Sequence, residues 1–379
     1  MIPYGKQSVD DADIAAVVEA LRSDWLTQGP LVDRFEKALA ERCGARHAVV
    51  VANGTVALHL ACLAAGLAPG DEGLTSSLTF LASANCMLYC GATPVFVDIR
   101  PDTWNVDPAK IEAAITERTK VIIPVHFAGL PCDMREIRAI ARARGLTVIE
   151  DACHALGATY EGQPIGAPEA ADMVCLSFHP VKHITTGEGG AILTQDDDVA
   201  ARLRRLRHHG ITKEPALLRR NDGPWYYEVH ELGYNGRLTD IQCALGISQL
   251  SRLDGFLDRR MAIARAYRAA LSDLPGISFQ KESSDRSHAY HLFVVHFDPA
   301  HIDRRAVFDK LREDGIAPQI HYVPVHGQPF MEERARVSGS MSETERYYAG
   351  CLSLPMYPTL SSVEQEKVIE ALRRAVCVS

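Results

Sequence analysis

One lysine in a loop rich in glycine and threonine is the residue of this sequence that most strongly indicates chemistry. The loop runs Ser177-Phe-His-Pro-Val-Lys-His-Ile-Thr-Thr-Gly-Glu-Gly-Gly190, between two strand-like runs at 173–178 and 191–194. A lysine at a strand end can lose its proton when partly desolvated, and its amine can then form a Schiff base with a carbonyl. Most loop lysines are simply solvated, so a role for Lys182 needs support from other residues.

The segment Asn53-Gly54-Thr55 offers a place for an anion. It lies between a predicted strand at 47–52 and a predicted helix at 55–65. Glycine lets the backbone approach a ligand closely, and the free N–H groups at a helix start attract negative charge. Thr55 can add a hydroxyl donor. Taken alone, the segment is equally typical of an ordinary helix cap.

The segment Glu150-Asp151-Ala-Cys-His154 ends a predicted buried strand at 147–151. A buried carboxylate is costly unless it is paired. One possible partner is a protonated pyridine nitrogen, as in pyridoxal enzymes, where the charged ring absorbs the electrons of a carbanion. A helix cap and a metal ligand are the competing roles for Asp151. His154 is either a neighbour of such a ring or a core histidine.

Two further residues follow predicted strands. Ser177 precedes Lys182 by five positions, so its hydroxyl could reach the same phosphate as Thr55. Phe80 could stack on a flat cofactor, although a plain core position explains it equally well. Ligands of open α/β sheets bind at the carboxyl ends of the strands, where all these residues are expected.

Composition limits the possible functions. The 379 residues are 47% hydrophobic and 23% charged, which is ordinary for a globular protein. A net charge of −8 argues against nucleic acid or an anionic membrane as a partner. The ten cysteines include no Cys-x-x-Cys pair and no zinc spacing, so we expect no metal. Without an apolar leader, this cysteine usage predicts a cytoplasmic protein.

The order of predicted elements indicates an α/β fold. Strand-like and helix-like runs alternate over the first two-thirds of the chain, which favours a mostly parallel sheet with helices on both faces. Thr239-Asp-Ile-Gln242 is a capping box that opens a long helical stretch to about residue 271. The remainder mixes strand signals, at 291–297 and 317–321, with helices. We therefore predict a large domain over 1–250 and a smaller α+β domain over 251–379.

With these motifs in view, the chain resembles the DegT/DnrJ/EryC1/StrS sugar aminotransferases. The resemblance is carried by the Lys182 loop and by segments 26–29, 53–59, 150–155 and 233–240. It implies the pyridoxal-phosphate-dependent transferase fold type I, similar to aspartate aminotransferase. It also implies a pyridoxal 5'-phosphate cofactor, with a pyridoxamine phosphate form during turnover.

The resemblance assigns roles to matching positions. Lys182 would hold the cofactor as an aldimine, Asp151 would pair with the pyridine nitrogen, and His154 would lie beside the ring's phenolic oxygen. The phosphate would be held by Gly54, Thr55 and Ser177, with Phe80 stacked on the ring. Asn235 would reach the phosphate in a neighbouring subunit, which implies a homodimer with shared active sites. The positions that would line the sugar-nucleotide site are Tyr4, Trp25, Leu26, Thr27, His321, Tyr322 and His326.

Within the family, segments 178–190 and 225–230 are similar to the branch that makes the pseudaminic acid precursor for surface or flagellar glycans. That branch aminates C4 of a UDP-linked 2-acetamido-4-keto-2,6-dideoxy sugar, with L-glutamate as donor. Another nucleotide sugar, linked to GDP or dTDP or of the UDP D-series, is the main competing substrate.

Two other functions on the same fold compete with the aminotransferase hypothesis, and each would leave a recognisable feature in the sequence. Sugar dehydratases of this fold would carry a histidine in place of Lys182. A ligand-sensing regulator would carry a DNA-binding domain ahead of the enzyme-like part. Both features are missing from this sequence, which favours the aminotransferase.

Three positions depart from the pattern of the family. Gly236 replaces a usually bulky residue between an asparagine and an arginine, which affects either substrate fit or local rigidity. Gly73 and Ser77 replace an apolar residue and a proline. We expect these last two changes to affect only loop stiffness.

Overall fold

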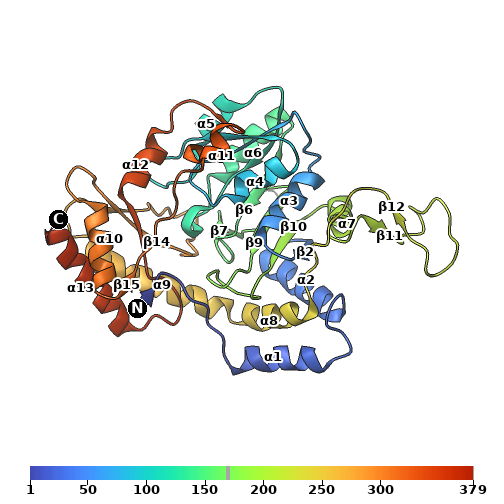
Figure 1. The fold of residues 1–379 in the computed structure, drawn as a ribbon, viewed down its shortest axis with the longest axis horizontal. Coiled ribbons are helices and arrows are strands. Elements are labelled where there is room, and N and C mark those ends of the chain that lie inside the picture. The colour runs from blue at the N-terminus through green and yellow to red at the C-terminus, as the bar shows by residue number, and fades with distance from the viewer. Residues whose placement is uncertain (168–170, 379) are drawn as a thin grey trace.

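A central eight-stranded sheet forms the framework of the computed structural model, which describes residues 1–167 and 171–378 (Figure 1). β10 runs antiparallel to both of its neighbours, β9 and β2, and the other described strand pairs of this sheet are parallel. The order across the sheet is β16 (Arg336–Val337), β4 (Thr93–Val97), β3 (Glu72–Ser76), β5 (Thr119–Ile123), β6 (Thr147–Asp151), β9 (Met173–Ser177), β10 (Gly190–Thr194) and β2 (His47–Val51). The predicted mostly parallel α/β sheet is confirmed.

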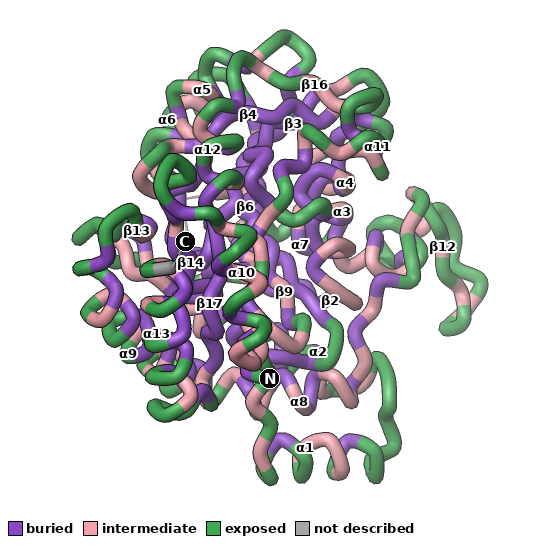
Figure 2. Tube along the Cα trace, turned by 60° about the vertical axis from the view of Figure 1, so that its left-hand side comes forward, coloured by how far each residue is buried: buried purple, intermediate pink, exposed green. Residues whose placement is uncertain are grey.

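Helices cover both faces of this sheet, because successive strand residues point to opposite sides and both sides are apolar. Val49 and Val51 belong to one apolar cluster, whereas Ala48 and Val50 belong to another. Figure 2 shows the central strands buried. The first face carries α3 (Gly54–Ala64), α4 (Ala82–Tyr89) and α7 (Asp197–Leu206), and the second carries α2 (Pro30–Cys43), α5 (Pro108–Ala114), α6 (Met134–Arg144) and α8 (Asp240–Ser251).

A second apolar core lies in the C-terminal part of the chain and is drawn in orange and red in Figure 1. A three-stranded antiparallel sheet in the order β13-β14-β17 contributes to it. Its elements are α9 (Leu253–Leu271), β13 (Ile277–Phe279), β14 (Phe293–Phe297), α10 (Arg304–Glu313), β17 (Cys351–Leu354) and α13 (Ser362–Val378). Tyr347 of α12 (Ser342–Gly350) packs instead in a separate cluster with Trp104 and Phe127.

Two details differ from the sequence-based prediction. The helical stretch after the confirmed Thr239–Gln242 capping box is divided at Arg252, whose guanidinium lies 2.7 Å from the buried carboxylate of Asp13. The strand predicted at 317–321 is much shorter, because β15 comprises only Ile316–Ala317. After Ala317 the chain makes a single antiparallel bridge, between Gln319 and Ser353.

Two strand pairings cross the predicted domain boundary. β1 (Ile2–Pro3) pairs in parallel with β15, and β16 joins the large sheet through β4. A division near residue 250 therefore stays a prediction. The smaller elements are α1 (Asp11–Arg22), η1 (Phe127–Gly129), β7 (Thr159–Tyr160), β8 (Gln163–Pro164), η2 (Val325–Gly327) and α11 (Pro329–Glu332).

An arm over residues 208–234 projects from the body of the molecule (Figure 1). It contains β11 (Ile211–Thr212) and β12 (Glu228–Val229), which pair antiparallel. Much of the arm is exposed (Figure 2). In the part of the chain that the structure describes, no helix combines the length and the apolar character needed to cross a bilayer.

Candidate active site

Lys182 lies in the loop between β9 and β10, where backbone hydrogen bonds hold the loop closed. The Phe178 N–H donates to the Gly189 carbonyl at 2.8 Å, and the Phe178 carbonyl accepts from the Thr186 N–H at 3.0 Å. Part of Lys182 is exposed, but its amine is desolvated. That amine has no hydrogen-bond or ion-pair partner among the described residues. Burial lowers the pKa of Lys182 below its ordinary value, against the opposing effects of Cys153 and Asp151.

Asp151 ends β6, and a relay of hydroxyl groups fixes its carboxylate. Oδ2 accepts a 2.6 Å hydrogen bond from the Ser83 hydroxyl, and Oδ1 accepts from the Cys153 N–H at 3.2 Å. Ser83 lies 2.7 Å from the Thr79 hydroxyl. Because Ser83 gives its only hydrogen to the carboxylate, Thr79 must be the donor to Ser83. Sequence reasoning missed Ser83, although its position four residues after Thr79 at a helix start is a usable signal.

His154 is a neutral ring packed between aromatic neighbours. Its Nε2 lies 3.1 Å from the Tyr322 hydroxyl, and its ring centroid is 4.3 Å from that of His291. Burial, and then the positive charge of Lys182, hold the pKa of His154 well below its usual range. Its Nδ1 is buried with no partner among the described residues. A buried polar atom of this kind indicates that a further group belongs beside it.

Gly54 begins α3 and lies beside Ser177. A Cβ at position 54 would lie 2.9 Å from Ser177 Cβ and 3.2 Å from its Oγ, so only glycine fits this contact. Asn53 caps the helix by accepting from the Val56 N–H at 2.9 Å. The first N–H groups of α3 and the Ser177 hydroxyl beside Gly54 are donors of the kind that suit a phosphate.

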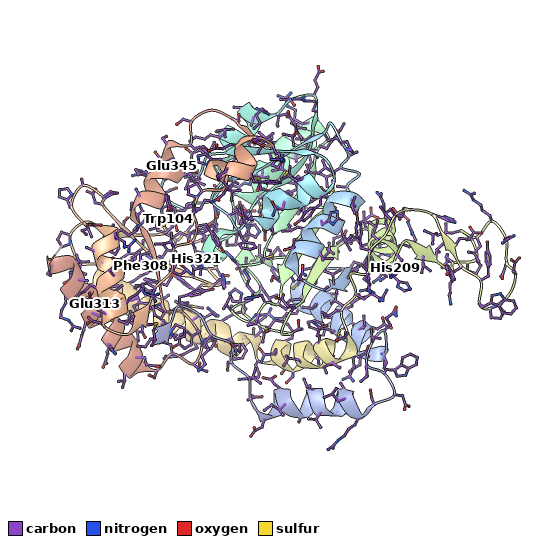
Figure 3. The ribbon with its side chains drawn as sticks, in the orientation of Figure 1. Trp104, His209, Phe308, Glu313, His321 and Glu345 are labelled. Atoms are coloured by element: carbon purple, nitrogen blue, oxygen red, sulfur yellow. The ribbon has the colours of Figure 1, made fainter. Side chains whose placement is uncertain are left out.

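The predicted substrate-side residues fall into two groups. Tyr4, His321 and Tyr322 lie together, with ring centroids 5.0 Å apart for Tyr4 and His321 and 4.9 Å apart for His321 and Tyr322. Figure 3 places His321 near the centre of the molecule. Burial, and then Lys182, lower the pKa of His321 to about 3. Phe80 is exposed and its ring centroid lies 6.2 Å from that of Tyr322, so it is not a core residue.

The second group is exposed and stands apart from the first. Thr27 bridges to Thr239 at the start of α8, and the neighbouring Trp25 and Leu26 are exposed. Asn235 is exposed and bridges to His208. Within the described part of the chain, no hydrogen bond or ring contact links Trp25, Leu26, Thr27 or Asn235 to the residues around Lys182.

The sequence matches the DegT/DnrJ/EryC1/StrS aminotransferase family over residues 7–373. The chain belongs to this family. SpsC of Bacillus subtilis, a spore coat polysaccharide biosynthesis protein, is 41% identical over 99% of this chain and 97% of its own. The Spr1654 protein of Streptococcus pneumoniae in its PMP form superposes with a TM-score of 0.93, at 30% identity and full coverage of both chains. PseC of Helicobacter pylori, an aminotransferase of pseudaminic acid biosynthesis, superposes at 0.92 with 29% identity over 99% of each chain.

The protein is thus a sugar aminotransferase of fold type I that uses pyridoxal 5'-phosphate, and the Spr1654 relative has been solved with both forms of the cofactor. The residues of this chain fit that group. The Gly54 backbone lies too close to Ser177 for any Cβ, the buried Asp151 carboxylate is held in one orientation, and the buried Nδ1 of His154 has no partner among the described residues. The last two features would be costly in an aminotransferase that bound nothing there.

Proposed function

We propose that this sugar aminotransferase moves the amino group of L-glutamate to C4 of a UDP-linked 2-acetamido-4-keto-2,6-dideoxy sugar, on the cytoplasmic route to pseudaminic acid and its surface or flagellar glycans. The likeness to PseC over 99% of both chains supports this substrate. The resemblance of segments 178–190 and 225–230 to the same branch supports it independently of overall shape.

The observation that carries the chemistry is a desolvated lysine amine beside a fixed carboxylate. Bound pyridoxal phosphate supplies a ring that withdraws electrons from the carbon that loses a proton. We assign Lys182 as the covalent attachment point and as the base that removes the proton from the donor's α-carbon. In the second half of the cycle, its amine returns a proton at C4 of the sugar. Positioned acid–base groups of this kind contribute about 10²–10⁴-fold in rate.

The other residues hold the cofactor and keep the site dry. We assign Asp151 to the pyridine nitrogen, because its carboxylate is already oriented by Ser83. Gly54, Thr55 and Ser177 would bind the phosphate, and Phe80 would cover the ring. His154, His183, His291 and His321 all have pKa values below the usual histidine range because of burial, so they add no positive charge around Lys182.

We further propose a homodimer in which Asn235 of one subunit completes the phosphate site of the other. Apolar side chains gather on the exposed arm, including Trp225 at 72% exposure and Leu232 at 80%. Clustered exposed apolar residues typically mark an interaction surface. Since no hydrogen bond joins Asn235 to its own Lys182 region in the described part of the chain, an interface formed by the arm would give it a function.

A second candidate substrate is another nucleotide-linked 4-keto-6-deoxy sugar. This candidate is favoured by the higher identity to SpsC, a protein of spore coat polysaccharide biosynthesis, than to PseC. DesV of S. venezuelae also superposes, at 36% identity and a TM-score of 0.87. A shared fold therefore does not select the substrate by itself.

A two-step absorbance experiment separates these substrates. The holoenzyme is first converted to its aminated form with L-glutamate, and each of a panel of nucleotide 4-keto sugars is then added. Recovery of the absorbance of the lysine-bound cofactor with the UDP-N-acetyl-L-arabino-hexulose alone supports the proposal. Recovery only with a GDP- or dTDP-linked sugar or the D-series UDP sugar would overturn the substrate assignment while keeping the chemistry.

A further inference from the structure

Ser77, which we expected to affect only loop stiffness, makes three hydrogen bonds to η2. Its carbonyl accepts from the Val325 N–H at 3.1 Å, and its Oγ accepts from the His326 N–H at 3.1 Å. The same Oγ lies 2.7 Å from Nδ1 of the His326 ring. Ser77 is completely buried, so water does not compete for these bonds. The hydroxyl therefore fixes both the backbone and the ring of His326.

The other ring nitrogen of His326 is also engaged. Nε2 lies 2.9 Å from a carboxylate oxygen of Glu345 on α12, which Figure 3 labels. At this distance the carboxylate oxygen would repel a bare nitrogen lone pair, so Nε2 carries a hydrogen. In the neutral ring Nδ1 is then an acceptor, and the Ser77 hydroxyl is the donor that satisfies it. Ser77 and Glu345 thus select the same tautomer from opposite sides of the ring.

We propose that Ser77 is a positioning residue that keeps the ring proton of His326 on Nε2, and that Glu345 holds this N–H until the sugar nucleotide replaces it. The inference rests on the proposed function, in which His326 lines the sugar-nucleotide site. A hydroxyl or diphosphate oxygen of the substrate is the acceptor that the Nε2–H suits.

Burial explains why Ser77 stays bound to the His326 ring whereas Glu345 can be replaced. The Glu345 side chain is 55% exposed, and a contact made by such an exposed carboxylate contributes little to stability, so a substrate oxygen can displace it. Ser77 is buried, and losing its bond would leave Nδ1 unpaired. The family resemblance leads us to expect a proline at position 77, and proline has no hydroxyl. Control of the His326 tautomer from this position is therefore specific to chains that carry serine there.

The segment that carries Ser77 also connects it to the cofactor side. Thr79 and Ser83, two and six residues further on, orient Asp151, and Phe80 lies between them. One short stretch after β3 therefore positions groups on both sides of the predicted reaction centre. A change at Ser77 should nevertheless act only on the sugar side, because its bonds go to η2 and not to Asp151.

The test compares Ser77→Ala with Ser76→Ala in the holoenzyme. Ser76 is also a buried serine, but its hydroxyl accepts from the Leu78 N–H and not from His326. Ser77→Ala should raise the KM for the nucleotide sugar about three- to tenfold, the range expected when one hydrogen bond is lost. It should leave kcat and the rate of the glutamate half-reaction within about twofold of wild type, and Ser76→Ala should change none of these values.

A double-mutant cycle and a spectroscopic measurement identify the cause. In a His326→Ala background, Ser77→Ala should have no further effect on KM, because its route to the substrate is gone. An undiminished effect in that background would overturn the proposal. The ¹⁵N shifts of the His326 ring, assigned by their loss in His326→Ala, should report Nε2–H in wild type and a tautomer mixture in Ser77→Ala.

The two kinds of readout also separate this inference from the proposed substrate. The ring tautomer is measured without any sugar, and the KM comparison uses whichever nucleotide sugar the wild type accepts. An Nδ1–H tautomer in wild type would refute the role of Ser77 even if the UDP sugar is the substrate. A correct tautomer and KM split with a different sugar would refute only the substrate.

Discussion

Two regions of the active site differ in how much of their structure a single chain supplies. The floor consists of Asp151, His154 and Lys182, and the rim consists of Trp25 and Phe80 with their neighbours. Asp151 is 6% exposed and His154 is 5% exposed, whereas Trp25 is 56% exposed and Phe80 is 57% exposed. Floor side chains are held by the central sheet and by hydroxyl groups from α4, while rim side chains reach out with few partners.

This difference indicates which part of the reaction each region governs. A floor with fixed dipoles and low hydration stabilises charge that develops during proton transfer, which is common to both half-reactions. A rim with exposed apolar rings gains its partners only when a substrate or a second subunit arrives. Substitutions in the floor should therefore affect both substrates, and those in the rim should depend on the sugar or on protein concentration.

Lys182→Ala should give the largest effect, because it removes both the attachment point and the base. We expect turnover to fall by at least about 10³-fold and the absorbance of the lysine-bound cofactor to disappear, while the fold stays intact because a desolvated amine is lost. The measurements are steady-state rates, the absorbance spectrum and thermal unfolding. Lys120→Ala, which removes an exposed lysine at β5, is the matched control. Substantial activity in Lys182→Ala would refute the assignment of the floor.

Ser83→Ala should slow both half-reactions by about tenfold or more, since a hydrogen bond to a charged group contributes about 1.5–3 kcal/mol. Asp151 would lose the donor that orients Oδ2. Thr79→Val, one step further along the relay, should have a smaller effect in the same direction. Single-turnover rates with glutamate and with the keto sugar provide the measurement, and Ser251→Ala on the exposed side of α8 is the control. A loss confined to the sugar half-reaction would show that Ser83 does not act through Asp151.

Substitutions in the exposed arm should reduce activity in a different way, by weakening self-association. Trp225→Ser combined with Leu232→Ser should weaken self-association by about tenfold or more, because large apolar anchors dominate interface energies. Activity per subunit should then fall on dilution and recover at high protein concentration. Sedimentation and activity across a concentration series provide the measurement, with Val363→Ser, at 76% exposure on α13, as control. Concentration-independent activity from a monomeric wild type would remove the shared-site proposal.

The floor was largely predictable from sequence and the rim was not, for a physical reason. Asp151 and Ser177 end strands and Gly54 follows one, and parallel strands bring their carboxyl ends to one edge, so the local pattern places them near one another. The contacts of His154 with Tyr322 and of Ser77 with His326 join segments 168 and 249 residues apart. No periodicity encodes such pairs. The division between α8 and α9 was missed because the apolar spacing continues through Arg252.

The pKa of Lys182 should show a smaller effect, which tests how far the floor is shielded from water. Desolvation disfavours the charged ammonium, so the pKa of Lys182 lies below its ordinary value of 10.5. The opposing negative charge comes from Asp151, since burial raises the pKa of the Cys153 thiol well above its usual range and leaves it uncharged near neutral pH. The neutral amine, which is the form that reacts with a carbonyl, is thus present at lower pH than in an exposed lysine.

The rate at which apoenzyme captures pyridoxal phosphate should therefore rise with pH and level off at a midpoint below 10.5. Stopped-flow absorbance over a pH series gives this midpoint, and Nα-acetyl-lysine in solution supplies the reference for a fully hydrated amine. A midpoint at or above that of the reference would mean that Asp151 outweighs desolvation. In that case water or a counter-charge would reach the floor before the cofactor binds, and the contrast between a dry floor and an exposed rim would hold only for the loaded enzyme.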